Sequence, residues 1–304
     1  MMPCRLSRRY AGSLALALLA SPALAQYGST TPDAQPNNYP PALPARRGPG
    51  PALVFERIGE VALPGPLASR PAWIAGDFIL VPVEGGVVEL GPDPGAKPEL
   101  VGKPEPEVPS EWILSGNGKR RYRTTQEGLV EAERRSRARR GWSRSWRIIA
   151  PNSILSPPIL VGPRLCYAGL DDRVTCVRAS NGHRLWAVDL GDRLSRVLAV
   201  WPSGNAAKPD GEILLAVPDD GASVIALDAY DGRRVATYEL PPHHHFASPA
   251  LVFPGDRIAL ARKGYDDREA ALVLLRLVPP PPAGPPSAVP YNGAPPLIPE
   301  PSGR

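Results

Sequence analysis

The chain has 304 residues, of which 41 are proline and 29 are glycine, and its formal net charge at pH 7 is +5. Removing the three arginines of residues 1–25 leaves +2, and removing the +8 carried by residues 119–147 leaves −6. This distribution excludes a uniformly basic surface and indicates one basic region in an otherwise acidic chain.

Residues 1–25 have the three parts of a secretory signal peptide. Three arginines precede an uncharged run over residues 11–19, and Ala-Leu-Ala forms a small-residue cleavage site, which predicts cleavage after Ala25. The alternative is a short membrane anchor, but a span needs roughly 18 apolar residues and Pro22 interrupts this run. Cys4 precedes the apolar run, so no lipoprotein attachment site is visible. We expect an exported, periplasmic or extracellular protein that is not an integral membrane protein.

Two proline-rich segments, residues 26–52 and 279–304, flank the rest of the chain. Neither has a periodic apolar pattern, so neither can bury enough apolar surface to offset the entropy lost on ordering. We expect disordered segments, a linker and a tail. Proline-rich segments can also bind aromatic grooves as extended ligands, which is the alternative reading.

Residues 53–278 carry a repeated pattern of short strands and turns. The third strand of each unit begins near residues 87, 129, 174, 224 and 272, so successive units are 42, 45, 50 and 48 residues apart. First strands are expected in step at residues 71–74, 110–113, 156–159, 195–198 and 248–251. A period in the forties with four strands per unit is typical of propeller blades. The sequence therefore predicts an all-β protein, a β-propeller of about five four-stranded blades.

The last unit lacks a fourth strand, because its third strand runs into the prolines of residues 279–282, which cannot donate ladder hydrogen bonds. An additional strand is predicted over residues 53–63, before the first complete unit. This N-terminal strand can complete the last blade and close the ring, with Phe55 in the place of a closing tryptophan.

The third and fourth units share a spaced motif. The third unit has Cys176, Arg178, Gly182 and Trp186, and the fourth has Ala226, Asp228, Gly232 and Ala236. These positions resemble the Ala-x-Asp-x-x-Thr-Gly-Lys-x-x-Trp repeat of the PQQ-like, or quinoprotein-like, β-propeller family, which includes propellers of the BamB type. The resemblance implies the blade unit, whereas relatives usually have seven or eight blades.

Cys166 and Cys176 are the two cysteines that remain after signal cleavage. Their midpoint is residue 171, at the centre of a predicted turn, so a hairpin there places them directly opposite each other. Opposed residues at a non-hydrogen-bonded position have Cα atoms about 4.5 Å apart, which a disulfide can span. An exported protein meets an oxidising compartment, so we expect a disulfide. Two core thiols are the alternative.

Residues 119–147 contain eleven Lys or Arg against three Glu. Such a segment favours a basic face on the second blade that attracts polyanions, with tryptophans available to stack or to form cation–π contacts. The alternative is a solvated outer loop. The predicted partner-binding residues are Arg134, Arg135, Arg137, Arg139, Arg140, Trp142 and Trp146.

Other polar clusters favour structural roles. His243, His244 and His245 are consecutive, so in an extended segment they point to opposite sides and cannot easily meet one ion, and we predict no metal site. The Asp-Asp pairs at residues 171–172, 219–220 and 266–267 recur at the same turn of three blades, which suggests turn chemistry.

None of the common hydrolase, nucleotide-binding or metalloprotease motifs is present. We therefore expect a non-catalytic β-propeller that acts as a binding or scaffold module. Its expected partner is an envelope protein or an anionic cell-surface polymer or lipid, not a nucleic acid, and no cofactor is predicted. The alternative is a quinoprotein-type, PQQ-dependent oxidoreductase or another propeller enzyme. Quinoprotein dehydrogenases use adjacent cysteines, which this sequence lacks.

Overall fold

The computed structural model describes residues 53–68, 72–75, 78–91, 97–101, 112–136, 141–202, 212–253, 255–264 and 269–281. All of them belong to one compact unit, Ala42–Arg304. Within these ranges no helix is long and apolar enough to cross a membrane. The described residues do not include the predicted signal peptide, residues 26–52 and 282–304 of the proline-rich segments, or Arg137, Arg139 and Arg140.

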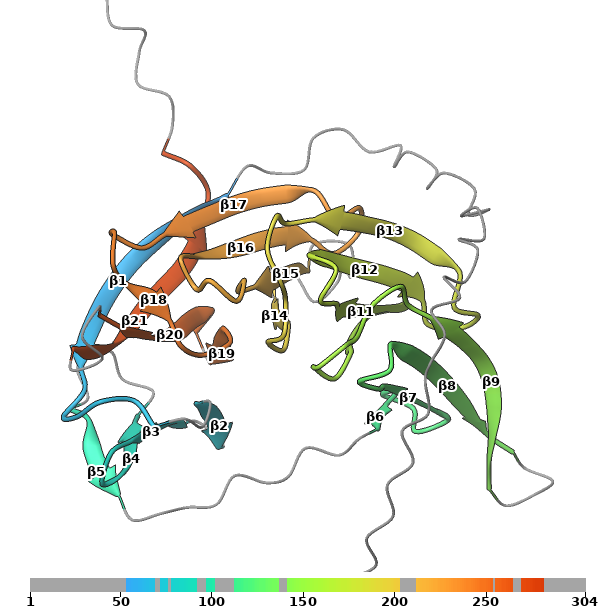
Figure 1. Cartoon of the computed structure of the whole chain (residues 1–304), viewed down its shortest axis with the longest axis horizontal. Coiled ribbons are helices and arrows are strands. Elements are labelled where there is room, and N and C mark those ends of the chain that lie inside the picture. The colour runs from blue at the N-terminus through green and yellow to red at the C-terminus, as the bar shows by residue number, and fades with distance from the viewer. Residues whose placement is uncertain are drawn as a thin grey trace, which may run out of the picture. The chain divides into compact units, whose positions relative to one another are not determined.

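The first two sheets are four-stranded antiparallel meanders in chain order (Figure 1). The first sheet consists of β2 (Trp73–Ala75), β3 (Phe78–Val83), β4 (Gly86–Leu90) and β5 (Glu99–Val101). The second consists of β6 (Ile113–Leu114), β7 (Arg120–Thr124), β8 (Leu129–Arg135) and β9 (Trp142–Ile149).

The third and fourth sheets repeat the same order of strands. The third consists of β10 (Ile159–Val161), β11 (Arg164–Ala168), β12 (Arg173–Arg178) and β13 (Arg184–Asp189). The fourth consists of β14 (Ala199–Trp201), β15 (Ile213–Ala216), β16 (Ser223–Asp228) and β17 (Arg234–Glu239).

The fifth sheet combines both ends of the described chain. It consists of β18 (His245–Phe246), β19 (Leu251–Phe253), β20 (Arg257–Lys263), β21 (Ala270–Val278) and β1 (Val54–Ala62). The N-terminal strand β1 runs antiparallel to β21, with Val54 opposite Val278 and Ala62 opposite Ala271. This is the pairing that the sequence predicted for residues 53–63, whereas closure of a ring by this strand stays a prediction. β18 was not predicted.

An all-β chain of five antiparallel sheets built from this repeated meander is a β-propeller, as expected. The third strands begin at or within two residues of the predicted positions. The first strands were placed too early: β10, for example, begins at Ile159 rather than at residue 156. The prolines at positions 157 and 158 cannot donate to a ladder, and in the fourth sheet the amide of Ser195 donates instead to Asp219 Oδ1 (3.0 Å).

A bulge recurs at one position of the outermost strand in four sheets. A bulge adds one residue to a strand and increases its local twist. The residue that follows the bulge faces the third strand, and it is Trp146 in the second sheet, Trp186 in the third, Ala236 in the fourth and Gly59 in the fifth. The predicted equivalence of Phe55 with the closing tryptophan is therefore wrong, because Gly59 holds that position. Phe55 packs edge-on against Tyr238, with ring centroids 6.3 Å apart.

The spaced motif explains how each tryptophan contacts the next sheet. The indole N–H of Trp186 donates to the carbonyl of Ala229 (3.2 Å), and a Cβ placed on Gly232 would lie 2.5 Å from the Trp186 ring. Gly232 also has a φ of +77°, which side-chain-bearing residues rarely adopt. The tryptophan of one sheet therefore rests on the glycine turn of the following sheet.

Ala236 lacks such a contact for a topological reason. The third and outermost strands of the fifth sheet, β21 and β1, come from opposite ends of the described chain, so no glycine hairpin joins them. The fifth sheet therefore lacks the glycine turn that corresponds to Gly182 and Gly232, on which the tryptophans of the second and third sheets rest. The departure of the fourth unit from the repeat thus follows from how the fifth sheet is assembled.

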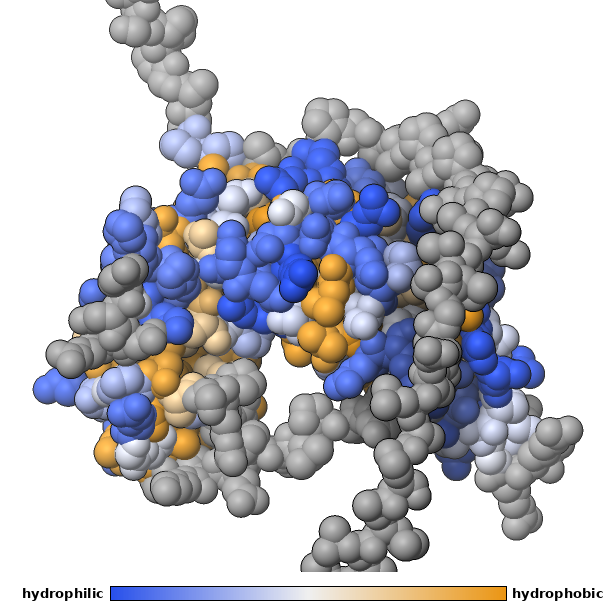
Figure 2. Space-filling view, in the orientation of Figure 1, coloured by the Kyte–Doolittle hydropathy of each residue, from blue (hydrophilic) through white to orange (hydrophobic). Residues whose placement is uncertain are grey.

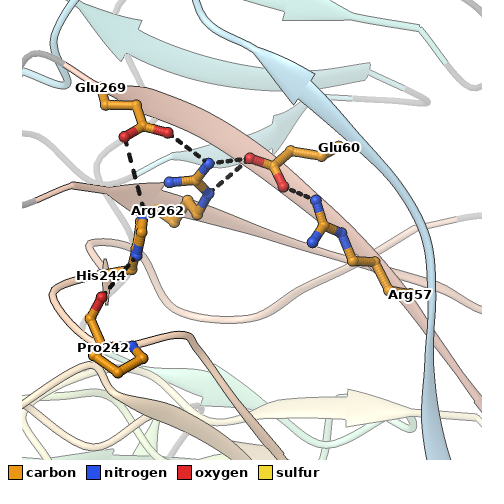
Figure 3. Close-up of polar contacts among 6 residues, drawn as sticks. All are labelled: Arg57, Glu60, Pro242, His244, Arg262 and Glu269. Carbon is orange, nitrogen blue, oxygen red and sulfur yellow. Dashed lines mark hydrogen bonds and ion pairs between the residues drawn. The ribbon is translucent and has the colours of Figure 1, made fainter.

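Ionic contacts connect β1 to the rest of the fifth sheet (Figure 3). The Arg262 guanidinium lies between two carboxylates, donating from Nε to Glu60 Oε1 (2.7 Å) and from Nη2 to Glu269 Oε1 (3.0 Å). Glu60 also pairs with Arg57, and Glu269 lies 3.8 Å from His244 Nε2. Burial lowers the pKa of Arg262, but hydrogen bonds to the two glutamates outweigh it and the pKa is raised. Arg262 therefore stays charged.

Four apolar clusters pack the sheets in pairs. They join the second sheet to the third, the third to the fourth, the fourth to the fifth and the fifth to the first. Within the described ranges, none of these four clusters spans the first and second sheets. One face of the second sheet thus differs from its counterparts.

A disulfide joins the cysteines that the sequence placed opposite each other. Cys166 on β11 faces Cys176 on β12, with Cα atoms 4.1 Å apart, and both residues are fully buried. This separation is close to the value of about 4.5 Å for a non-hydrogen-bonded antiparallel pair.

Candidate functional site

The second sheet has one buried face and one charged face. Tyr122, Val130 and Ala132 are buried and pack with Leu165 and other side chains of the third sheet. Burial raises the pKa of Tyr122, although Arg120 partly opposes this, so its phenol stays neutral. Because side chains alternate along a strand, the intervening residues of β7, β8 and β9 lie on the opposite face.

Charged side chains form two rows across that opposite face. Arg121 of β7 lies opposite Glu133 of β8, which lies opposite Arg144 of β9. In the neighbouring row the order is Arg123, Glu131 and Arg147. Each row therefore has one glutamate between two arginines.

The glutamates pair with the arginines of β7. Arg121 Nη2 lies 2.6 Å from Glu133 Oε2, and Arg123 Nη2 lies 2.8 Å from Glu131 Oε2. Cross-strand pairs of opposite charge contribute roughly 0.2–1 kcal/mol each. The arginines of β9 are exposed, and no ion pair of theirs is present among the described residues.

Two tryptophans contact the arginines of β7 in these rows. The Arg121 guanidinium lies 4.2 Å from the ring centroid of Trp112 and 4.7 Å from that of Trp142. Arg123 lies 4.6 Å from the Trp112 ring. Arginine above an indole face is stabilised by the ring quadrupole. These contacts hold the β7 arginines in place while they pair with the glutamates.

We call the residues of this surface the basic face. It carries five arginines and two glutamates, a formal charge of +3, together with two tryptophans. Its members are Trp112, Arg121, Arg123, Glu131, Glu133, Arg135, Trp142, Arg144 and Arg147. Figure 2 shows hydrophilic residues at the edge of the molecule where Figure 1 draws β9.

The structure separates the predicted site residues. Arg135 and Trp142 lie opposite each other on the basic face, and Arg134, also exposed, lies one residue before Arg135 in β8. Trp146 turns to the buried face, where its indole N–H donates to the Ala179 carbonyl (3.1 Å) and its ring rests on Gly182. Its contacts are those of Trp186 in the next sheet. The predicted binding role of these residues stays a prediction.

Sequence reasoning missed the residues that form most of the basic face. Arg144, Arg147, Arg121, Arg123 and Trp112 were not among the predicted site residues. The alternation Arg-Tyr-Arg in β7 and Glu-Ala-Glu in β8 is a signal for a charged face opposite an apolar one. The predicted binding residues were instead those of the densest run of arginines.

The other polar clusters have local partners. His244 Nδ1 lies 3.1 Å from the Pro242 carbonyl oxygen, and His245 Nδ1 lies 3.1 Å from that of Asp220. The described residues contain no group of His, Cys, Asp or Glu arranged to hold a metal ion. Asp220 accepts from the amide of Ala222 (3.0 Å), and Asp172 has a φ of 64°. Both are turn features, whereas residues 266–267 lie outside the described residues.

Comparisons with known proteins give only weak similarities. No family model matches the sequence, and no curated protein matches it. Among solved structures, BamB from Moraxella catarrhalis is similar over 71% of this chain and 66% of that chain, at 14% identity and a TM-score of 0.40. Sqt1 from Chaetomium thermophilum is similar over 54% and 44%, at 13% identity and a TM-score of 0.43. This chain thus spans less than two thirds of either protein, and such weak similarity carries nothing about activity.

Proposed function

We propose that this protein is a non-catalytic binding module of the cell envelope whose second sheet binds an anionic macromolecule. One observation carries the proposal: Arg135, Arg144 and Arg147 are exposed on one sheet face, and none has an ion pair among the described residues. The glutamates of that face are already paired with other arginines. Its net positive charge is therefore directed to solvent, where it attracts polyanions.

Two further features support this assignment. Disulfides persist in oxidising compartments, so the buried Cys166–Cys176 disulfide supports export. The tryptophan-to-glycine contacts support a PQQ-like repeat used as a scaffold. The proposed partner is an envelope protein or an anionic cell-surface polymer or lipid. Binding through this face needs no cofactor.

Retention on heparin and on anionic vesicles tests the proposal. The triple variant Arg135→Gln, Arg144→Gln and Arg147→Gln should elute at clearly lower salt than the parent. Salt should also displace the parent, since the Debye length falls from about 10 Å at 0.1 M to about 3 Å at 1 M. The variant should unfold within about 0.5 kcal/mol of the parent, because exposed charges away from packed features change stability little.

A matched control distinguishes a local site from net charge. Arg178, Arg193 and Arg234 are exposed arginines of other sheets or loops, and changing them to glutamine removes the same three charges. This control should be retained like the parent. Equal loss by both triple variants, or by neither, contradicts the proposal.

A further inference from the structure

The basic face ends at an open strand edge. β9 is the last strand of the order β6-β7-β8-β9, and among the described residues it pairs only with β8 (Figure 1). It has eight residues, compared with six in β13, six in β17 and three in β5. The outer edge of a strand presents unpaired N–H and C=O groups, which can pair with another extended chain.

The two charged rows stop at this edge with an arginine. Charges alternate as Arg121, Glu133, Arg144 in one row and as Arg123, Glu131, Arg147 in the other. A carboxylate beyond Arg144 and another beyond Arg147 would continue both alternations. Glu131 and Glu133 are two residues apart, so the rows are separated by about 6.7 Å along the strand.

The alternate residues of an extended polypeptide have the same spacing as the two rows. Alternate residues of a strand point to the same face and are about 6.7 Å apart, so two glutamates separated by one residue meet both arginines. Arg144 and Arg147 are three residues apart in β9, but the bulge at Ser145 places them opposite positions two residues apart on β8. An added strand that accommodates the bulge as β8 does meets both arginines with alternate residues. A lipid headgroup or a sugar polymer lacks the regular alternation of N–H and C=O groups that pairs with a strand edge.

The next position along the same face is apolar. Ile149 lies opposite Leu129, two residues beyond the row of Glu131 and Arg147, and it is 66% exposed. A strand antiparallel to β9 would therefore present, from its N-terminus, an apolar residue opposite Ile149 and then carboxylates opposite Arg147 and Arg144. Only a peptide with this alternation satisfies all three positions.

We propose that β9 binds an extended acidic segment of a partner protein as an additional antiparallel strand. The segment has the pattern apolar-x-acid-x-acid, with its carboxylates beside Arg147 and Arg144. The proposal rests on the proposed function and names its partner as an acidic polypeptide.

Peptide binding tests it with matched probes. A capped heptapeptide in which Val, Glu and Glu alternate with Thr is titrated against the whole protein and followed by fluorescence anisotropy. A second peptide places the two glutamates next to each other, so that they point to opposite faces at the same total charge. A third keeps the alternation but is N-methylated at alternate residues on the side facing β9, which removes its backbone donors.

The alternating peptide should bind most tightly. Each of Arg144→Gln and Arg147→Gln should weaken it about three-fold, within the range of an exposed ion pair, whereas Arg178→Gln should not weaken it. The peptide with adjacent glutamates and the N-methylated peptide should both bind several-fold more weakly than the first.

Three outcomes overturn the proposal. Equal binding of the alternating and adjacent peptides would show attraction by charge without strand pairing. Arginine-dependent retention on heparin or vesicles without binding of the alternating peptide would leave the proposed function standing and assign the face to a polymer or a lipid. Loss of all anion binding would remove the proposed function as well.

Discussion

The second and third sheets have the same strand order and the same bulge, yet four equivalent positions carry opposite chemistry. In the third sheet Leu165 lies opposite Val177 and Tyr167 lies opposite Thr175. The corresponding pairs of the second sheet are Arg121 with Glu133 and Arg123 with Glu131. Leu165, Tyr167 and Val177 pack on the second sheet, whereas the charged residues at the corresponding positions form part of the basic face.

This contrast separates what a blade requires from what it can vary. Both sheets retain the bulge and a tryptophan resting on the next glycine turn, so close that an added Cβ would lie 2.8 Å from the ring at Gly182 and 2.5 Å from it at Gly232. The third sheet contributes to two apolar clusters, whereas the second contributes to one of the four. Among the described residues the second blade thus has one packed face and the tryptophan contact, and its other face lies outside the four clusters.

Exchanging the two kinds of pair between the sheets should have the largest effect on stability. The double variant Leu165→Arg, Val177→Glu places an ion pair where both side chains are at most 1% exposed. Desolvation of buried charges exceeds their attraction unless all remaining hydrogen bonds are made, so we expect a loss of more than about 4 kcal/mol in the free energy of unfolding. Urea unfolding followed by tryptophan fluorescence measures it.

The reverse exchange is the control. Arg121→Leu with Glu133→Val gives the second sheet the residues of the third, and we expect a change within about 1 kcal/mol, because replacing an ion pair with apolar residues is often neutral. A large loss here would mean that the ion pairs are needed for the second blade to fold.

Tryptophan substitutions should have smaller effects, and these should differ between a packed indole and one on the basic face. Trp186 is 5% exposed, and Trp186→Ala should lose about 3–5 kcal/mol, since it removes both an indole from the core and the bond to Ala229. Trp142 contacts Arg121 on the basic face, and Trp142→Ala should lose less than about 1 kcal/mol. Thermal unfolding shows which of the two variants loses more stability. Equal losses of stability would show that Trp142 is part of the packed core.

The regular part of this fold could be predicted from the sequence. The third strands are bounded by turn residues and lie at the centre of their sheets, so their apolar runs were located within two residues. The N-terminal strand followed from counting strands, since the prolines after β21 cannot supply a ladder. The first strands are short edge strands, and the serines and prolines before them made their first residues hard to predict.

The sequence does not show which residues share the basic face, because it does not show the register between β8 and β9. Trp146 follows Ala132 by 14 positions, whereas Trp186 follows Cys176 and Ala236 follows Ala226 by 10 positions each. The longer hairpin hides which residue of β9 faces which residue of β8, and a bulge shifts the alternation once more. Arg144 and Arg147 share a face only because the extra residue, Ser145, lies between the two rows.

The last difference between the sheets lies at the centre of their second hairpin. The second sheet pairs Tyr122 with Ala132, and the third pairs Cys166 with Cys176 at the same position. The disulfide closes a loop with a sequence separation of 10, for which the loss of loop entropy in the unfolded chain predicts about 2–3 kcal/mol. Reduction should therefore lower the free energy of urea unfolding by this amount, with the fold retained below the midpoint. In a Cys4→Ser background, Ellman titration of the denatured, unreduced protein should find no free thiol. Two thiols per chain would mean that the third sheet is held by packing alone, as the second is by Tyr122 against Ala132.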